Sequence, residues 1–231
     1  WSKAYQSLTK SAQNLMWCLV SELRFTGSRK KKDFVYTNNE AISEEKCKEI
    51  VDYTHNWRDI FKGHLFRPFQ RLKVPSEFSY RFEVTRSSDS NFLLLEMNPE
   101  FSKSINEVLD KALEEYVTKY PAMALITPNG FHSQCIKYHI VKQGEGYHTW
   151  HSEWSSTKPQ DQRILVWHIA LTSHENEGEL EFLYHDNRIP SKVGRLIIWP
   201  AFFPWVHRGN AIRTNTEKHY LTGWFSCMDG K

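Results

Sequence analysis

The hydrophobic pattern of the chain changes along its length, from helical spacing in the first 120 residues to short alternating runs after residue 133. Apolar side chains recur every three or four residues over positions 3–23, which predicts an amphipathic helix. A second helix is predicted over 43–57, because Ser43 can cap it and acidic residues occupy its first turn. A third, over 100–120, has one apolar face and ends before Pro121.

Beyond residue 133, short β-branched or alternating runs bounded by Gly, Pro and Asn predict strands. These strands are expected at 134–142, 163–171, 179–184, 194–199, 205–208 and 218–226. Helices first and strands later predict an α+β fold. The length of 231 residues fits one domain, 1–231. We expect it to comprise an N-terminal helical extension (1–32), helix-rich support (33–132) and a strand-rich core (133–228).

Composition narrows the class of protein. Hydrophobic residues make up 40% of the chain, and neither a membrane-spanning apolar run nor a secretory pattern occurs, so we expect a soluble protein without a membrane partner. The four cysteines, at 18, 47, 135 and 227, show no paired spacing. That spacing is typical of free thiols in a reducing compartment, and we expect the cytoplasm.

Charge argues against nucleic acid as a partner. The formal net charge is only +3 and the sequence pI is about 8.6. The basic run at 29–32 lies between a predicted helix and a predicted strand, where a solvated linker is the simpler interpretation.

The most specific chemical feature is His151-Ser152-Glu153 followed by His207. Two imidazoles and one carboxylate can bind one face of an octahedral iron(II) and leave the other face open for reactants. Residues two apart in an extended chain point the same way, so His151 and Glu153 can converge. A His-x-Glu pair alone is more often a solvated surface pair, but glycines and aromatics around it favour a metal site. The His-Glu-x-x-His run of zinc proteases is absent from the sequence.

Six segments in order resemble the catalytic half of iron(II)- and 2-oxoglutarate-dependent oxygenases of the prolyl 4-hydroxylase-like branch. They are the glycine-rich approach to His151-x-Glu153, the strand RILVWHIAL at 163–171, EGELEF at 177–182, PSKVGRLIIWP at 190–200, HRGN at 207–210 and KHYLTGWF at 218–225. A weaker likeness covers 34–47. The resemblance implies a double-stranded β-helix, or jelly roll, as the catalytic core at 133–228, supported by the N-terminal helices.

The resemblance also implies an activity and its cofactors. His151, Glu153 and His207 would bind iron(II), with glutamate in place of the commoner aspartate. The co-substrates would be 2-oxoglutarate and O2, and hydroxylation would release succinate and CO2. The substrate is expected to be an amino-acid residue, a peptide or a small molecule. Two alternatives stay open: a nucleic-acid-modifying oxygenase and a catalytically inactive metal-binding jelly-roll protein. The oligomeric state also stays open.

The resemblance points to a basic residue on the last strand as the 2-oxoglutarate anchor. Lys218 matches that position, but it lies one residue further from His207 than is usual, which leaves Arg213 as a rival. Thr222 falls on the same face of the strand as Lys218 and is expected to line the pocket. On the strand before the iron-binding loop, Tyr138 and His139 are candidate co-substrate contacts.

Overall fold

The computed structural model describes residues 33–60, 67–68, 90–93 and 98–227, except 128, 134 and 155–162. The predicted extension at 1–32, with its helix, lies outside this part of the chain. None of the described helices is both long and apolar enough to cross a membrane. The elements are β1 (Tyr36–Asn38), α3 (Glu44–Ile60), β2 (Arg67–Pro68), β3 (Ser90–Leu93), α5 (Pro99–Lys119), α6 (Met123–Ile126), β4 (Phe131–Ser133), β5 (Lys137–Val141), β6 (Tyr147–His151), β7 (Arg163–Ala170), β8 (Leu180–Phe182), β9 (Asn187–Ile189), β10 (Leu196–Pro200), β11 (His207–Gly209) and β12 (Lys218–Cys227).

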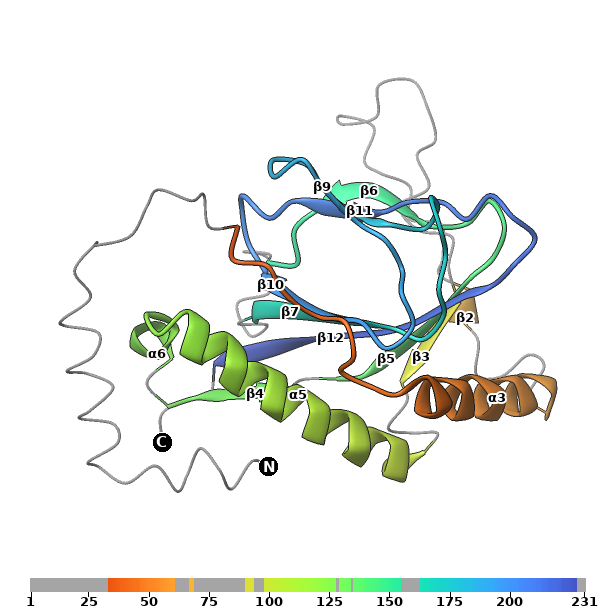
Figure 1. The fold of residues 1–231 in the computed structure, drawn as a ribbon, viewed down its shortest axis with the longest axis horizontal. Coiled ribbons are helices and arrows are strands. Elements are labelled where there is room, and N and C mark those ends of the chain that lie inside the picture. Colours follow the sequence, from red (N-terminus) through yellow and green to blue (C-terminus); the bar gives the residue numbers. More distant parts are fainter. Residues whose placement is uncertain are drawn as a thin grey trace.

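The strands form two antiparallel sheets that face each other (Figure 1). The large sheet has the order β1-β10-β7-β12-β5-β3-β2, with β4 also paired to β12. The small sheet has the order β6-β11-β8-β9. Apart from the consecutive pairs β2–β3 and β8–β9, neighbouring strands are not consecutive in the sequence, which is the arrangement of a double-stranded β-helix. The predicted α+β class and the jelly roll are confirmed.

Helices α3 and α5 lie against the large sheet on the side away from the small sheet (Figure 1). Asn98 caps α5 by accepting hydrogen bonds from the amides of Glu100 and Phe101, and Pro99 fits its first turn. The buried face of α5, including Ile105 and Leu109, packs into the main hydrophobic core. The helices therefore hold the large sheet from outside and leave its other face to the cavity between the sheets.

Alternation along β7 and β10 gives the large sheet two different faces. Leu165 and Trp167 of β7 belong to the core under the helices. Val166 of β7 and Trp199 of β10 belong to a smaller core between the sheets. Successive side chains of a strand point to opposite faces, so one strand contributes to both.

The predicted elements match the structure closely where the pattern was strongest. The helices expected at 43–57 and 100–120 correspond to α3 and α5, and the strand at 163–171 corresponds to β7. The strand expected at 134–142 corresponds to β5, whereas β4, which lies just before it and also pairs with β12, was not predicted. The short strands β1, β6 and β9 lack a clear alternation of buried and exposed residues, which explains why the pattern missed them.

Candidate active site

The expected metal ligands come from two neighbouring strands of the small sheet. His151 ends β6, and Glu153 follows it after one residue. His207 begins β11, which pairs with β6 so that His207 lies directly opposite His151. Side chains directly opposite in an antiparallel pair lie on the same face, so the strand pairing brings these distant residues together.

One ligand atom from each of the three residues lies within 4.8 Å of the others. Nε2 of His151 is 3.1 Å from Oε1 of Glu153, and Nε2 of His207 is 3.8 Å from the same oxygen. The two imidazole ring centroids are 4.4 Å apart. Two nitrogens and one carboxylate oxygen thus converge on one point, which is the donor set of a non-haem iron(II) centre.

Backbone carbonyls orient both histidine rings. Nδ1 of His151 lies 2.9 Å from the carbonyl oxygen of Thr149, and Nδ1 of His207 lies 3.0 Å from that of Trp205. A carbonyl oxygen only accepts, so each Nδ1 carries the hydrogen and donates it. In the neutral ring this leaves the lone pair on Nε2, directed at the convergence point, as in most metal-binding histidines.

Two hydrogen-bond donors bind the carboxylate oxygen of Glu153 that does not face the histidines. Its Oε2 accepts hydrogen bonds from Nε1 of Trp224 at 3.0 Å and from Nη1 of Arg163 at 3.3 Å. The Arg163 guanidinium in turn lies 3.7 Å from the centroid of the Trp224 ring. Oε2 is therefore fixed, and Oε1 is left facing the histidines.

The electrostatic surroundings keep the ligands in the protonation states that a metal requires. Burial raises the pKa of Glu153, but the hydrogen bond to His151 and the nearby positive charges outweigh it and lower this pKa to about 2. Burial lowers the pKa of His207 to about 4, with a further contribution from His151. At neutral pH Glu153 is an anion and His207 is neutral, so neither must lose a proton to bind a metal.

The three residues open onto a cavity of about 340 Å³ between the sheets. This volume is near the lower end of the range for small-molecule pockets, roughly 300–1,000 Å³. Part of the wall comes from the inner face of the large sheet. That part includes His139, His168, Lys218, Tyr220 and Thr222.

Lys218 places a buried cation in this cavity. Its side chain is only 5% exposed, its Nζ donates a hydrogen bond to the carbonyl of Gly178 at 2.6 Å, and it lies 4.9 Å from the Tyr220 ring centroid. Lys218, Tyr220 and Thr222 alternate along β12 and therefore share its inner face. Thr222 donates its hydroxyl to the carbonyl of Trp167 at 2.7 Å.

Gly178 is required for this position of the lysine. Its φ is +62°, and a Cβ there would lie 2.5 Å from Cδ1 of Ile212 and 3.2 Å from Cδ of Lys218. A side chain at this position would therefore push against Ile212 and the aliphatic part of Lys218.

Two histidines enclose the ring of Tyr220. The rings of His139 and His168 stack against it, with centroids 4.5 Å and 4.7 Å away. Burial, and then the positive charge of Lys218, holds the pKa of His168 well below its usual range. His168 is therefore neutral, and its Nδ1 has no hydrogen-bond partner within the described part of the chain. The charge at this end of the cavity comes from Lys218.

Two expected co-substrate residues do not reach the cavity. Arg213 is exposed on the turn before β12, where its guanidinium donates to the carbonyl of Asn176. Tyr138 belongs to the core under the helices, and its hydroxyl lies 2.8 Å from Nδ1 of His219. The structure therefore gathers most of the predicted site residues around one cavity and leaves these two outside. Those that it gathers are His139, His151, Glu153, His207, Lys218 and Thr222.

Sequence reasoning did not assign Arg163, Trp224 or Tyr220 to the site. Tyr220 and Trp224 share the parity of Lys218 along β12, so the period of the strand was a usable signal. Arg163 gave no comparable signal, because it reaches Glu153 through the pairing of β7 with β12.

Residues 133–226 match the family described as the 2OG-Fe(II) oxygenase superfamily. A Pseudomonas putida prolyl-4-hydroxylase has a TM-score of 0.60 at 13% identity, over 86% of this chain and 95% of that one. A viral collagen prolyl hydroxylase of Paramecium bursaria Chlorella virus-1, solved with 2OG, gives 0.55 at 16% identity, over 87% and 100%. A Trichoplax adhaerens prolyl hydroxylase, in complex with a hypoxia inducible factor peptide, gives 0.57 at 14% identity, over 97% and 94%. No curated protein sequence matches the chain.

The family match covers the strands that carry the cavity, from β5 to β12. It also spans the His-x-Glu…His set and the buried lysine. Residues 133–226 are thus similar to the 2OG-Fe(II) oxygenase superfamily, the chain has the fold of the prolyl hydroxylases, and its enzyme class is that of a 2-oxoglutarate-dependent oxygenase.

Proposed function

We propose that this oxygenase hydroxylates an amino-acid side chain of a peptide or protein. In this proposal His151, Glu153 and His207 bind iron(II), and Lys218 binds the far carboxylate of 2-oxoglutarate. The main support for these roles is that one cavity of about 340 Å³ contains both the three convergent ligands and a buried ammonium group.

The ligand set fits iron(II). Both imidazoles present Nε2 while their Nδ1 atoms bind backbone carbonyls, and Glu153 keeps one oxygen directed at them. Three protein ligands on one side leave coordination positions for a bidentate co-substrate and O2. Iron held by these residues would supply the chemistry that couples oxidative decarboxylation of 2-oxoglutarate, which yields succinate and CO2, to hydroxylation of a C–H bond.

The inner end of the cavity fits a dicarboxylate. Lys218 can form a charge-assisted hydrogen bond with an anion, and its burial strengthens that pairing by excluding water. Its bond to the Gly178 carbonyl aims the ammonium group, and Thr222 lies on the same face of β12. The neutral His168 adds a polar atom without a competing charge.

Apolar walls restrict water near the metal ligands. The rings of Trp199 and Phe182 lie 5.1 Å and 5.9 Å from that of His207, and Val166 and Leu180 also line the cavity. Exclusion of water strengthens the electrostatic interactions inside the site and would limit side reactions there.

Exposed aromatic residues beside the iron ligands support a peptide substrate. The backbone amides of Glu153 and Trp154 both lie 2.9 Å from the Ala201 carbonyl, which places the segment carrying Phe203 next to Trp154. Trp154 is 51% exposed and Phe203 is 70% exposed, and Phe203 packs edge-on against Tyr184. Exposed aromatic clusters often mark protein-binding surfaces. A prolyl hydroxylase of similar fold has been solved with a peptide bound.

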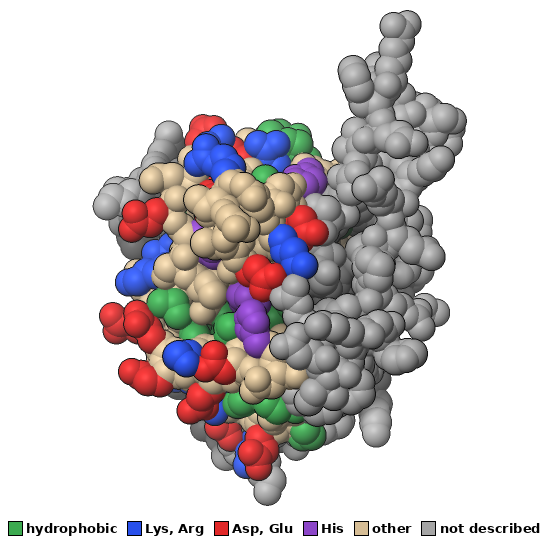
Figure 2. Space-filling view, turned by 90° about the vertical axis from the view of Figure 1, so that its right-hand side faces the viewer, with side chains coloured by type: hydrophobic (Ala, Val, Ile, Leu, Met, Phe, Trp, Pro, Cys, Tyr) green, Lys and Arg blue, Asp and Glu red, His purple; other side chains and the backbone are tan. Residues whose placement is uncertain are grey.

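The charge distribution favours a peptide over a nucleic acid. On the face in Figure 2, acidic and basic side chains are interspersed among the described residues, without a continuous basic surface. Nucleic-acid binding draws most of its affinity from clustered Lys and Arg on phosphates.

The test is succinate release, measured with iron(II), 2-oxoglutarate and O2 across panels of peptides, free amino acids and nucleotides. The proposal expects peptide-stimulated turnover and a product heavier by one oxygen atom in mass spectrometry. Trp154→Ala combined with Phe203→Ala should raise the KM for peptide while leaving the uncoupled decarboxylation of 2-oxoglutarate unchanged. Stimulation by free amino acids or nucleotides alone would overturn the peptide assignment.

A further inference from the structure

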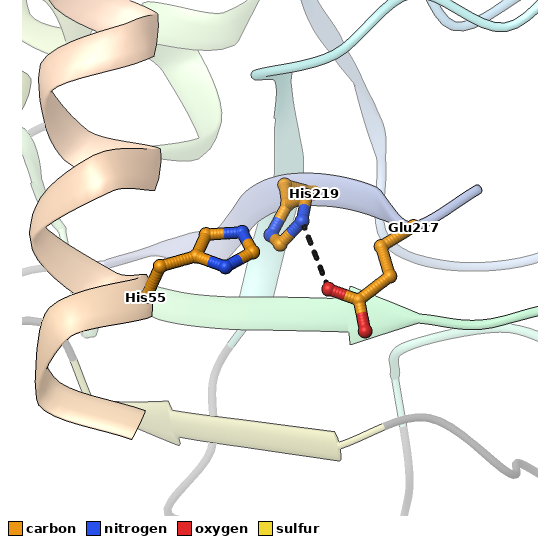
Figure 3. A group of neighbouring side chains, drawn as sticks. All are labelled: His55, Glu217 and His219. Carbon is orange, nitrogen blue, oxygen red and sulfur yellow. Dashed lines mark ion pairs between the residues drawn. The ribbon is translucent and has the colours of Figure 1, made fainter. Parts of the chain in front are cut away.

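A second group of histidine and carboxylate side chains lies outside the cavity. His55 comes from α3, Glu217 precedes β12, and His219 is the second residue of β12. Figure 3 shows the three side chains pointing toward one another between the helix and the strand. One ligand atom from each lies within 4.8 Å of the others, a limit that the active-site ligands also meet.

Nε2 of His219 faces the Glu217 carboxylate. This atom lies 3.6 Å from Oε2 of Glu217, and the His55 and His219 ring centroids are 5.1 Å apart. The other ring nitrogen, Nδ1, lies 2.8 Å from the Tyr138 hydroxyl. Metal-binding histidines generally have such a partner on the nitrogen that does not bind the metal, and it fixes the orientation of the ring.

This group is separate from the active site because it lies on the opposite face of β12. Lys218 faces the cavity, whereas His219 contacts Tyr138 in the core under the helices. His219 is 3% exposed, the Glu217 side chain is 27% exposed, and His55 is exposed. One rigid ligand is therefore held inside, and the other two border solvent, so water has access to further coordination positions.

We propose that His55, Glu217 and His219 form a second transition-metal site, of the two-histidine, one-carboxylate type that zinc binds with water as its fourth ligand. The bound ion would cross-link α3 to the start of β12. The site is independent of the proposed substrate class, because none of its ligands lines the cavity.

The alternative is a local contact between His219 and Glu217 that binds no metal. In that case the side chains would add only a modest pairwise attraction at this half-exposed position. A metal requires all three ligands, whereas the pair requires only Glu217 and His219. Removal of His55 therefore separates the two.

The experiment measures the stoichiometry of Co²⁺ binding to the metal-free full chain, by its visible absorption and by elemental analysis after gel filtration. The proposal expects two equivalents for the unmodified chain and one each for His55→Ala and His207→Ala. The equivalent lost in His55→Ala and the one lost in His207→Ala should differ in absorption spectrum. His132→Ala, which removes an exposed histidine from β4, is the matched control and should retain two equivalents.

The metal affinity of the second site provides another measurement, which leaves all three metal-binding side chains in place. Tyr138→Phe removes only the hydroxyl beside His219 and should weaken the second site by roughly 10–100-fold, the usual effect of losing such a partner. Zn²⁺ should also raise the melting temperature of His207→Ala, whose remaining site is the second one, but not that of His55→Ala with His207→Ala combined. One equivalent in the unmodified chain, or unchanged binding in His55→Ala, would overturn this proposal and leave the oxygenase site unaffected.

Discussion

The two faces of the large sheet both bury side chains but differ in chemistry. On the outer face, Leu221 and Phe225 of β12 pack with the helices into a mainly apolar core. On the inner face, Lys218 and His168 are also buried, at 5% and 7% exposed, yet they are polar and line the cavity. Burying apolar groups stabilises a fold, whereas burying an ammonium group costs free energy unless it is paired. The difference separates the face that packs against the helices from the face that lines the cavity and is proposed to bind the reactants.

The largest expected effect comes from deleting a metal ligand on the cavity side. His207→Ala leaves two protein ligands, so iron affinity should fall by at least about a hundredfold, the upper end of what loss of a mere supporting partner costs. Succinate formation should stop. The variant should remain folded, because His207 belongs to neither hydrophobic core.

The control is His148→Ala, which removes a nearby histidine that is not part of the ligand cluster. It should retain iron, as measured by elemental analysis. Equal iron loss in both variants would mean that His207 has no special role.

Substitutions in the core on the outer face should lower the stability of the protein without changing its binding of 2-oxoglutarate. Leu109→Ala on α5 removes a fully buried side chain and should lower the free energy of unfolding by about 2–5 kcal/mol. Chemical denaturation measures the loss, and the KM for 2-oxoglutarate should not change. Lys111→Ala, at an exposed position of the same helix, should be nearly neutral. A shift in KM of the folded Leu109→Ala protein would break the separation between the two faces.

A smaller loss of metal affinity is expected when Glu153 loses the hydrogen bond from Trp224. Trp224→Phe keeps an aromatic ring next to Arg163 but removes the Nε1 donor to Glu153. Loss of such a partner typically weakens metal binding by about 10–100-fold. An iron titration under anaerobic conditions checks this, and unchanged affinity would show that Arg163 alone positions the carboxylate.

The smallest effect concerns the turn that precedes Lys218. The Glu177 carboxylate accepts hydrogen bonds from the amides of Arg213 and Thr214 at 2.7 Å and 3.0 Å. Burial raises its pKa, but the hydrogen bond from the Thr214 hydroxyl and then these two amide bonds outweigh it and lower the pKa from 4.5 to about 2. The stabilisation is thus fully present above pH 4.5 and is lost as the pH falls toward 2.

Glu177→Gln should therefore cost about 1 kcal/mol of unfolding free energy at pH 7, and the gap to the unmodified chain should narrow as the pH is lowered. Urea denaturation at several pH values measures this. A gap that stays constant with pH would contradict the assignment of the charge.

Much of the active site was predictable because its signals are local in sequence. The His-x-Glu spacing places two ligands on one side of an extended segment, and the order of motifs around them predicted the jelly roll. The parity of β12 predicted that Thr222 would face the same way as Lys218, and both line the cavity.

Other side-chain contacts depend on which strands pair and in which register, and this cannot be read from single positions in the sequence. Arg163 reaches Glu153, and Tyr220 stacks between His139 and His168, only because β12 lies between β5 and β7. The same pairing directs Tyr138 into the core. Likewise, His55 is far from β12 in sequence, and only the packing of α3 on the sheet brings it to His219.

The central claim, that the inner face of the large sheet binds the co-substrate through a buried lysine, is tested most directly by anaerobic calorimetry of 2-oxoglutarate binding to the iron-loaded protein. Lys218→Ala leaves a buried carboxylate unpaired, which typically costs about 2–5 kcal/mol, so binding should weaken by roughly a hundredfold or more. Iron affinity should stay nearly unchanged, and Arg213→Ala should bind 2-oxoglutarate normally. Normal binding by Lys218→Ala together with selective loss in Arg213→Ala would contradict the account.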